Sequence, residues 1–537
     1  MAVKGCHRLT LDDHRLTLDL WWEDATDTLC DLASPEAAWV DAWYLDGFAP
    51  ALNPGMWSAD LLHAVGRLSR PGATFATFTA AGQVRRDLLA AGFDVSKSPG
   101  FGRKRERLVG RLQTAPEHPP QGETPWDLGT RAAQRPATAL IVGGGLAGCT
   151  TAAALARRGV AVTLLERAGL AAGGSGNQQG ILYTRLSRRH SAQTDFALAS
   201  FCHASRHYRA LLVSGRLREG QDGALCGSFH QSGDDEEMAY LAEVLSKVPE
   251  LGQILDRQDA NRMLGVEQAS AGYWFPGSGW LRPVSVCQTV AATPNVQTLE
   301  HCGEISLRQA DGEWRAYCDD RLIARAHCAV IATGLQATAH PGLEWLPLRP
   351  IRGQTTQLPT SGTLGQLRAA LCHSGYVAPA RAGEHCIGAT FDLHDDCGQM
   401  RTTDHRHNLQ ALAAAVPSWQ AELEALDPAE LDGRVGYRCA TPDYLPLVGP
   451  APDLPAFLQT FAELRKNARR VLKNRGTFLP DLYLNTGDGS RGLSSTPLEG
   501  EYMESLICRE PATLTRDLCR ALAPARFIIR DLGRNRK

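Results

Sequence analysis

Residues 138–166 read TALIVGGGLAGCTTAAALARRGVAVTLLE, and this stretch predicts the fold of most of the chain. The apolar run at residues 139–142 is typical of a buried strand, and it leads directly into three glycines spaced G-x-G-x-x-G. An Ala- and Leu-rich segment follows and closes on two arginines and a glycine, which are helix-ending residues. A second strand at residues 160–165 then ends on Glu166. The stretch therefore predicts a βαβ unit that holds a dinucleotide.

Each part of this unit has a physical role. Gly143 allows the tight turn, Gly145 lets the backbone approach a pyrophosphate, and Gly148 lets helix and strand pack closely. The helix N-terminus offers N–H donors to the phosphates, and Glu166 would accept the hydroxyls of the adenosine ribose. Two alternatives are a glycine-rich loop in an ordinary α/β core and a membrane span, since residues 137–156 carry no charge. The clustered glycines and the strand-type run favour the nucleotide fold.

Composition narrows the class of protein and its compartment. The 537 residues suffice for about three domains, and 43% hydrophobic and 21% charged residues are typical of a soluble globular protein. The net charge of −2 provides no overall basic field, so a nucleic-acid partner would need local patches. Fifteen cysteines without a C-x-x-C pair or a His/Cys metal cluster indicate reduced thiols in the cytoplasm and no metal. The N-terminus lacks an apolar signal region, so we expect neither export nor membrane association.

The first 112 residues show the pattern of the back half of an open α/β sheet. Residues 7–24 alternate apolar and polar side chains as a hairpin does, and a strand at 40–45 ends on Asp46 before a Gly/Pro-rich loop. The elements expected after this loop are a helix at 56–68, a strand at 73–79, a helix at 83–91 and a strand at 107–112. Ligands of open sheets bind beyond the carboxyl ends of the strands, where we expect Asp24 and Asp46 to lie.

A proline-rich linker, residues 113–135, separates this part from residues 136–537. After the βαβ unit, a loop of small residues at 173–187 suits close approach to a flat cofactor. We expect an amphipathic helix at 195–212 and then strands and short helices up to residue 326, ending in a strand meander. This change of pattern predicts a substrate domain, roughly residues 191–326 and 350–436, inserted into the nucleotide fold.

Further segments return the chain to the nucleotide fold. Residues 327–334 predict a buried strand that ends on Gly334 and completes the sheet, and residues 352–358 and 436–449 contain further strands. Residues 484–493, LNTGDGSRGL, predict a strand that opens into glycines ahead of a helix. That arrangement would aim N–H groups and a helix dipole at the pyrimidine edge of a flavin. A purely structural turn is the alternative.

Two sets of motifs carry a resemblance to one family. LDGFAPALNPGMW at 45–57, ATFATFTAAGQVRRDL at 73–88 and GFGRKRE at 100–106 resemble the methyltransferase half of the MnmC family, bifunctional enzymes that finish 5-methylaminomethyl-2-thiouridine at the tRNA wobble position. SGNQQG, FPGSGWLRP, HCIGAT, RCATPDYLPLVG and GSRGL, all within residues 137–537, resemble its oxidase half and the glycine oxidase and D-amino-acid oxidase superfamily. The implied fold is α/β: an FAD-binding Rossmann-like domain with an inserted α+β substrate domain, preceded by the C-terminal half of a Rossmann-like methyltransferase sheet.

The resemblance implies two cofactors. For FAD, the matching positions are Gly143, Gly145, Gly148, Glu166, Ser175, Gly176, Asn177, Gly334, Gly487, Gly489, Ser490, Arg491 and Gly492. For S-adenosylmethionine, Asp24 would lie near the adenine and Asp46 beside the transferring methyl group or the accepting amine. The family's glycine-rich S-adenosylmethionine loop has no counterpart in this chain, and Leu52 and Gly55 depart from the family motif. We therefore expect an incomplete methyl-donor site. One alternative is that Asp46 only caps the end of its strand and has no part in methyl transfer. Another is that the start codon is misassigned, so that the missing part is encoded upstream.

The oxidase resemblance implies FAD-dependent removal of the carboxymethyl group from 5-carboxymethylaminomethyl-2-thiouridine in tRNA, which releases glyoxylate. An arginine fork suits the substrate carboxylate, and Arg438 matches the substrate-binding arginine of related oxidases. Arg352 and Tyr376 are further candidates, and a salt bridge to Asp443 is the alternative role for Arg438. A small-molecule glycine or sarcosine oxidase with a non-catalytic N-terminal module is the alternative function.

Basic runs are candidate contacts for tRNA phosphates. They are residues 103–107, residues 463–475, which suit one helix, and the C-terminal residues 526–537. Each run could also be a solvated surface. A third interpretation makes the first 112 residues a tRNA-docking module without catalytic activity.

Overall fold

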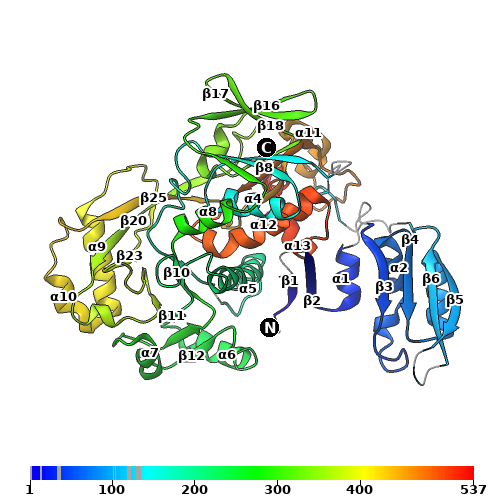
Figure 1. Cartoon of the computed structure of the whole chain (residues 1–537), viewed down its shortest axis with the longest axis horizontal. Coiled ribbons are helices and arrows are strands. Elements are labelled where there is room, and N and C mark those ends of the chain that lie inside the picture. The colour runs from blue at the N-terminus through cyan, green and yellow to red at the C-terminus, as the bar shows by residue number, and fades with distance from the viewer. Residues whose placement is uncertain are drawn as a thin grey trace.

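The computed structural model describes residues 3–11, 15–32, 38–100, 102, 105–117, 123–128, 135–184 and 186–536. Figure 1 shows a small N-terminal module beside a larger body, with the hairpin of the first two strands between them. The larger body contains two large sheets, one of six strands and one of nine, besides smaller ones. These two sheets position the candidate site.

The N-terminal module is built on a four-stranded sheet in the order β3-β4-β6-β5. Its elements are β3 (Val40–Leu45), η1 (Gly55–Trp57), α2 (Ala59–Leu68), β4 (Ser69–Thr77), α3 (Gly82–Ala90), β5 (Phe93–Pro99) and β6 (Glu106–Leu112). The core comprises apolar residues from α2, α3 and the sheet, including Leu62, Val65 and Phe75. The predicted helices and strands of this region are confirmed, and β5 is an additional strand.

The predicted hairpin is confirmed as β1 (Gly5–Leu11) and β2 (Leu16–Trp22), but these strands form a separate two-stranded sheet. The prediction that Asp24 and Asp46 lie at one sheet edge is therefore wrong. β1 packs instead against the larger body. Arg8 is buried and lies 3.5 Å from a carboxylate oxygen of Glu501 and 3.5 Å from one of Glu504. Because a buried guanidinium needs such partners, the hairpin is drawn to the larger body rather than to the N-terminal sheet. Helix α1 (Ala25–Leu32) follows the hairpin.

The linker is attached to the larger body where the structure describes it. Trp126 is buried in a cluster with Phe457 and Phe461, and the Thr124 hydroxyl accepts a hydrogen bond from the Leu472 N–H at 2.8 Å. This second contact holds residues 466–477 in an irregular conformation. The predicted helix at 463–475 is therefore wrong: only η5 (Ala462–Arg465) is helical.

The six-stranded sheet has the order β15-β8-β7-β19-β27-β26. Its strands are β15 (Val296–Leu299), β8 (Ala161–Leu165), β7 (Thr138–Val142), β19 (Cys328–Ile331), β27 (Phe478–Thr486) and β26 (Leu447–Pro452). All neighbours are parallel except β26 and β27. Helices α4 (Leu146–Arg157), α5 (Ala192–Val213), α8 (Pro283–Ala291) and α12 (Gly492–Cys508) pack with it. The uncharged run at residues 137–156 is thus a buried strand and core helix.

The nine-stranded sheet has the order β12-β13-β11-β21-β22-β23-β20-β24, with β25 also paired to β20. Its strands are β11 (Ser228–Gln231), β12 (Gln253–Leu255), β13 (Gly272–Phe275), β20 (Arg349–Pro359), β21 (Ala370–Cys372), β22 (Tyr376–Val377), β23 (Glu384–Gly388), β24 (Asp392–Leu393) and β25 (Gly433–Ala440). Helices α6 (Asp235–Leu245), α7 (Arg257–Leu264), α9 (Thr402–Ala415) and α10 (Gln420–Glu424) flank it (Figure 1). A small sheet of β9 (Gly180–Leu182), β10 (Gly223–Ala224) and β14 (Gly279–Leu281) completes this part of the body.

The packing of two segments suggests other boundaries for the inserted unit than those expected from the sequence. The meander β16 (Ile305–Ala310), β17 (Glu313–Cys318) and β18 (Arg321–Ala326) packs on the six-stranded sheet, because the buried Trp314 and Ala316 join the core of that sheet. β15 extends the same sheet directly. We propose that the substrate unit ends before β15 in its first part and includes β25 in its second.

Three short helices lie next to the irregular segment. α11 (Leu454–Thr460) precedes it in the chain, and α13 (Arg516–Leu522) and α14 (Arg526–Gly533) are the last two helices of the chain. Within the described residues, no helix has the length and apolar character needed to cross a bilayer.

Candidate functional site

A cavity of about 1250 Å³ lies between the two large sheets. One wall is formed by the carboxyl ends of β7, β8, β19 and β27, and the other by residues of β22, β23 and β25. The open edge of a parallel sheet is where dinucleotides bind, so the position agrees with the glycine motif.

The glycine motif of residues 143–148 forms the turn into α4. A Cβ on Gly148 would lie 1.8 Å from the Gly143 carbonyl oxygen, and a Cβ on Gly143 would lie 2.4 Å from the Ala332 carbonyl oxygen. Gly145 is the N-cap of α4, and the Leu146 N–H donates to the Ser175 hydroxyl at 3.1 Å. Gly143, Gly145 and Ser175 all line the cavity. The helix N-terminus therefore faces the space where a pyrophosphate would lie.

Glu166 lies at the end of β8 and lines the cavity. Its carboxylate accepts hydrogen bonds from the Gly144 N–H at 2.6 Å and the Ala168 N–H at 2.9 Å. Because each carboxylate oxygen has more than one lone pair, these bonds fix the side chain and leave acceptor capacity for a ribose.

The loop at residues 173–177 is held by an arginine that the sequence analysis missed. Arg434 of β25 donates to the Asn177 side-chain oxygen at 3.1 Å and to the Gly173 carbonyl at 2.5 Å. It also lies against Gly176, where a Cβ would come within 2.5 Å of its guanidinium. Burial lowers the pKa of Arg434. The sequence signal that could have identified Arg434 is its position four residues before Arg438 on the same strand.

Two further loops close the cavity. Gly334, Gly487, Gly489, Ser490 and Gly492 all line it. The backbone φ is +90° at Gly487 and +59° at Gly489, which favours glycine at both positions. Arg491 differs from the prediction because it lines a separate small cavity.

Arg438 and Tyr376 both line the cavity. Arg438 Nη1 donates to the carbonyls of Thr390 at 3.1 Å and Arg352 at 3.3 Å, and the guanidinium lies 5.3 Å from the Phe391 ring centre. Its Nε and Nη2 make no hydrogen bond within the described residues. Burial lowers the Arg438 pKa. The alternative salt bridge does not form, because Asp443 pairs with Arg526.

Tyr376 and two histidines line the same cavity. The Tyr376 hydroxyl donates to the Gln179 carbonyl at 3.3 Å, and burial raises its pKa well above the usual value. Burial lowers the pKa of both His230 and His373 to about 4. These histidines, which the sequence analysis did not single out, are therefore neutral at pH 7.

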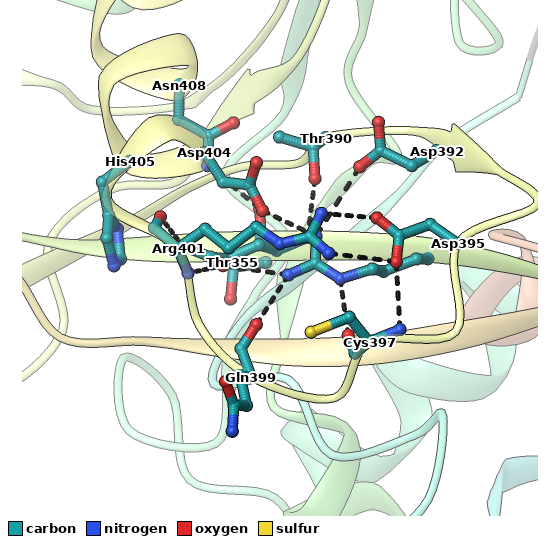
Figure 2. A network of polar contacts seen from close by, with 12 residues as sticks. Thr355, Thr390, Asp392, Asp395, Cys397, Gln399, Arg401, Asp404, His405 and Asn408 are labelled. Carbon is teal, nitrogen blue, oxygen red and sulfur yellow. Dashed lines mark hydrogen bonds and ion pairs between the residues drawn. The ribbon is translucent and has the colours of Figure 1, made fainter.

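Arg352 is a structural residue rather than a second carboxylate clamp. It is fully buried, and its Nη1 donates to Asp404 at 2.6 Å. Its Nε donates to the Cys397 carbonyl at 2.7 Å and its Nη2 to the Gln399 carbonyl at 2.8 Å. Figure 2 shows Asp404, Cys397 and Gln399 within this network of polar contacts. Because the guanidinium is saturated and does not line the cavity, the prediction that Arg352 binds substrate is not supported.

The two acids expected at the methyl-donor site are apart from this cavity. Asp24 is exposed, and its carboxylate accepts from the Thr26 N–H at 2.8 Å as the cap of α1. Asp46 is exposed just after β3. The described part of the N-terminal module thus does not bring these residues into one S-adenosylmethionine site.

The large cavity fits FAD. Asn485 Oδ1 and Thr333 Oγ1 are buried without a partner, and both residues line the cavity. Such polar atoms need a partner from a bound molecule or water. Together with the glycines whose Cβ positions are blocked, they indicate a polar, ring-bearing nucleotide.

Comparisons with known proteins agree with this geometry. Residues 138–506 match a family described as FAD dependent oxidoreductase, and residues 1–113 match one described as S-adenosyl-L-methionine-dependent methyltransferase. This chain is 42% identical to the MnmC protein of Pseudomonas aeruginosa and 40% identical to that of Pseudomonas entomophila. Each match covers 99% of this chain and 80% of the relative. The chain belongs to the MnmC family. The two predicted cofactors and the predicted fold class are confirmed at the level of the family.

Solved structures show the same fold for the larger body. Glycine oxidase from Geobacillus kaustophilus has a TM-score of 0.58 at 20% identity, covering 73% of this chain and 99% of that chain. Iminodiacetate oxidase from Chelativorans has a TM-score of 0.54 at 20% identity, covering 70% and 96%. At this identity the likeness concerns the fold alone.

Proposed function

We propose that the larger body oxidises the carboxymethylaminomethyl group of a tRNA wobble uridine and releases glyoxylate. The observation that carries this proposal is Arg438, a half-buried guanidinium in the cavity wall with donors to spare and no carboxylate partner among the described residues. A planar fork of this kind binds both oxygens of a carboxylate. The proposed substrate is an N-substituted glycine with one carboxylate.

The chain's own residues would orient the reacting carbon. Arg438 holds the carboxylate, Phe391 packs beside that arginine, and Tyr376 borders the same space. FAD, when bound, supplies two-electron oxidation of the methylene carbon next to nitrogen. The substrate loses a C–H bond and gains a C=N bond; water then adds to that carbon, and cleavage of the C–N bond gives glyoxylate and the aminomethyl uridine. Since His230 and His373 are neutral, they add no positive charge that would compete with Arg438 for the carboxylate.

A small-molecule amino-acid oxidase is not favoured. The relatives that match 99% of this chain are named as tRNA-modifying bifunctional proteins. Family membership includes a methyltransferase domain, and we place methyl transfer after the oxidation because the oxidation exposes the amine that would accept the methyl group. No disulfide joins the described cysteines, which supports the expected cytoplasmic location.

The tRNA would contact a surface that we call the C-terminal basic surface. It consists of the exposed residues Lys466, Arg469, Lys473, Arg534 and Arg536. The two basic segments meet there, because Ala468 lies against Gly533 of α14. None of the five cations forms an ion pair with a described residue, so all remain available to phosphates. Of the run at 103–107, residues 103 and 104 lie outside the described residues.

The proposal is tested by Arg438→Ala and Arg438→Lys. Both variants should retain bound FAD, because Arg438 contacts substrate rather than the glycine motif. Turnover of modified tRNA should fall by at least about 100-fold in the Ala variant, since a charge-assisted pair is lost. Lys should recover only part of the activity because it lacks the fork. Flavin absorbance and glyoxylate release give the two readouts. Normal turnover by the Ala variant would remove Arg438 from the site.

A further inference from the structure

Two carboxyl groups lie at the glycine loop of residues 487–489. Asp488 belongs to this loop, is half-buried and lines the large cavity. Glu499 lies within α12, is 0% exposed, and has no donor among the described residues for either carboxylate oxygen. The Ser495 hydroxyl, one turn before Glu499, donates to Asp488 Oδ1 at 3.0 Å. The proposed oxidation does not use either carboxyl group.

Glu499 is fully buried and neither of its carboxyl oxygens has a hydrogen-bond donor among the described residues, so its carboxyl group is neutral, because an ionised carboxylate buried without a partner is unstable. Asp488 accepts a hydrogen bond from the Ser495 hydroxyl and borders the cavity, which allows its carboxyl group to carry the charge. Burial is the main cause that raises the pKa of both, and the charge of Asp488 raises that of Glu499 further. The pair therefore holds one proton and one negative charge near neutral pH.

Within the described residues, no cation forms an ion pair with Asp488 or Glu499. Cys439 of β25 faces Asp488, and burial raises the pKa of its thiol to about 12, so it is neutral. On α12 itself the facing group is the Ser495 hydroxyl, and on α4 the helix backbone at Thr150 and Thr151 packs beside Gly500. Arg491 lines the adjacent small cavity without an ion pair to a described carboxylate. The protonation of the pair thus decides the charge at this side of the FAD site.

A second, small cavity connects to Asp488. Its volume is about 20 Å³, enough for one water molecule. Thr184 and Ser200 line it, are 2% and 1% exposed, and have hydroxyl groups without a partner. Unpartnered hydroxyls in a space of this size are where an ordered water is expected. Asp488 therefore borders both the FAD cavity and a polar, water-sized cavity.

We propose that Asp488 and Glu499 take up a proton, through the small cavity, when the FAD site is reduced. The inference rests on the proposed function, because the oxidation delivers electrons into the large cavity. Two electrons and one proton from the substrate add one negative charge there. The pair then goes from one bound proton to two, the added proton coming from solvent water. The charge of the site is restored, and reoxidation releases the same proton.

The test is the pH dependence of the midpoint potential of bound FAD, measured by spectroelectrochemistry without tRNA. Wild-type protein should take up one proton more per two electrons than Glu499→Gln. A carboxylic acid band that shifts in D2O should appear in the infrared difference between reduced and oxidised wild-type protein, and Glu499→Gln and Asp488→Asn should lose it. A role limited to packing would change neither the proton-to-electron ratio nor this band.

Asp481→Asn is the matched control, because Asp481 is a carboxyl with a burial-raised pKa on β27 that does not line either cavity. The number of protons that Asp481→Asn takes up per two electrons should equal that of the wild type. If Glu499→Gln fails to fold, Ser495→Ala removes the hydrogen bond to Asp488 without changing charge and should move the pH range of proton uptake upward. Equal ratios in wild type and Glu499→Gln, or no acid band in wild type, would overturn the inference. Failure of the wild-type protein to bind FAD would instead contradict the proposed function.

Discussion

Two arginines on adjacent strands illustrate what decides a residue's role. Arg352 and Arg438 lie on β20 and β25, and Ile351 pairs with Arg438 across the two strands. Both were reasonable carboxylate clamps from sequence, because residue type was the only information. The structure separates them by their partners: the segment at 392–404 surrounds Arg352 with acceptors, whereas Arg438 reaches the cavity with unused donors. Those acceptors come from a loop whose path no local pattern predicts.

Arg352→Met should destabilise the protein without acting on substrate binding directly. Asp404 would remain largely buried without its cation, which costs about 3–5 kcal/mol in free energy of unfolding. Urea unfolding of the variant measures this loss. Arg401→Met is the matched control from the same network, where the loss of a more exposed pair with Asp395 should lower the free energy of unfolding far less than Arg352→Met does. Equal stability of Arg352→Met and wild type would contradict the structural role.

At the scale of elements, the βαβ unit was predictable because every local signal agreed. Strand, glycines, helix and acid occur in one short stretch, and all were found in place. The predicted helix at 463–475 failed because the Thr124 contact with Leu472 comes from a distant part of the chain. The same holds for β2, whose alternation predicts a strand but not the sheet to which it belongs. Arg8 makes that choice by pairing with carboxylates of α12.

Two glycines of the motif should respond differently to alanine. Gly148→Ala places a Cβ 1.8 Å from a backbone carbonyl of the same turn, so α4 must shift and FAD binding should be lost. Gly145→Ala meets only the Ser175 side chain, at 3.1 Å, which can rotate at the expense of its bond from Leu146. It should weaken FAD binding by about tenfold, corresponding to the removal of one hydrogen bond.

Flavin content after purification and titration of the apoprotein with FAD measure both effects. Wild-type affinity in Gly148→Ala would show that the turn is not in contact with the cofactor. If Gly145→Ala lost more affinity for FAD than Gly148→Ala, the expected order of the two effects would be contradicted.

At the scale of the whole molecule, the oxidation site and the C-terminal basic surface are built by separate elements. The triple variant Lys466→Glu, Arg469→Glu and Lys473→Glu should weaken tRNA binding and leave the flavin spectrum unchanged. The dependence of log affinity on log salt should become shallower by roughly 0.7–0.9 for each phosphate that the protein no longer neutralises. Electrophoretic mobility or fluorescence anisotropy at several salt concentrations gives both values.

The control variant reverses the charges of Lys247 and Arg257, which belong to the region of α6 and α7. In Figure 1 these two helices lie on the far side of the molecule from the chain's C-terminus. This double variant should bind tRNA as the wild type does. Equal weakening by both variants would show that the effect comes from net charge and not from the C-terminal basic surface.

The most direct test of the proposed oxidation uses FAD-loaded protein and tRNA that bears 5-carboxymethylaminomethyl-2-thiouridine, with nucleosides analysed by mass spectrometry. The account predicts that the carboxymethyl nucleoside disappears and that glyoxylate is formed in equal amount. The aminomethyl nucleoside should accumulate when S-adenosylmethionine is absent. Unchanged nucleoside in FAD-loaded wild-type protein, together with rapid oxidation of free glycine, would contradict the account.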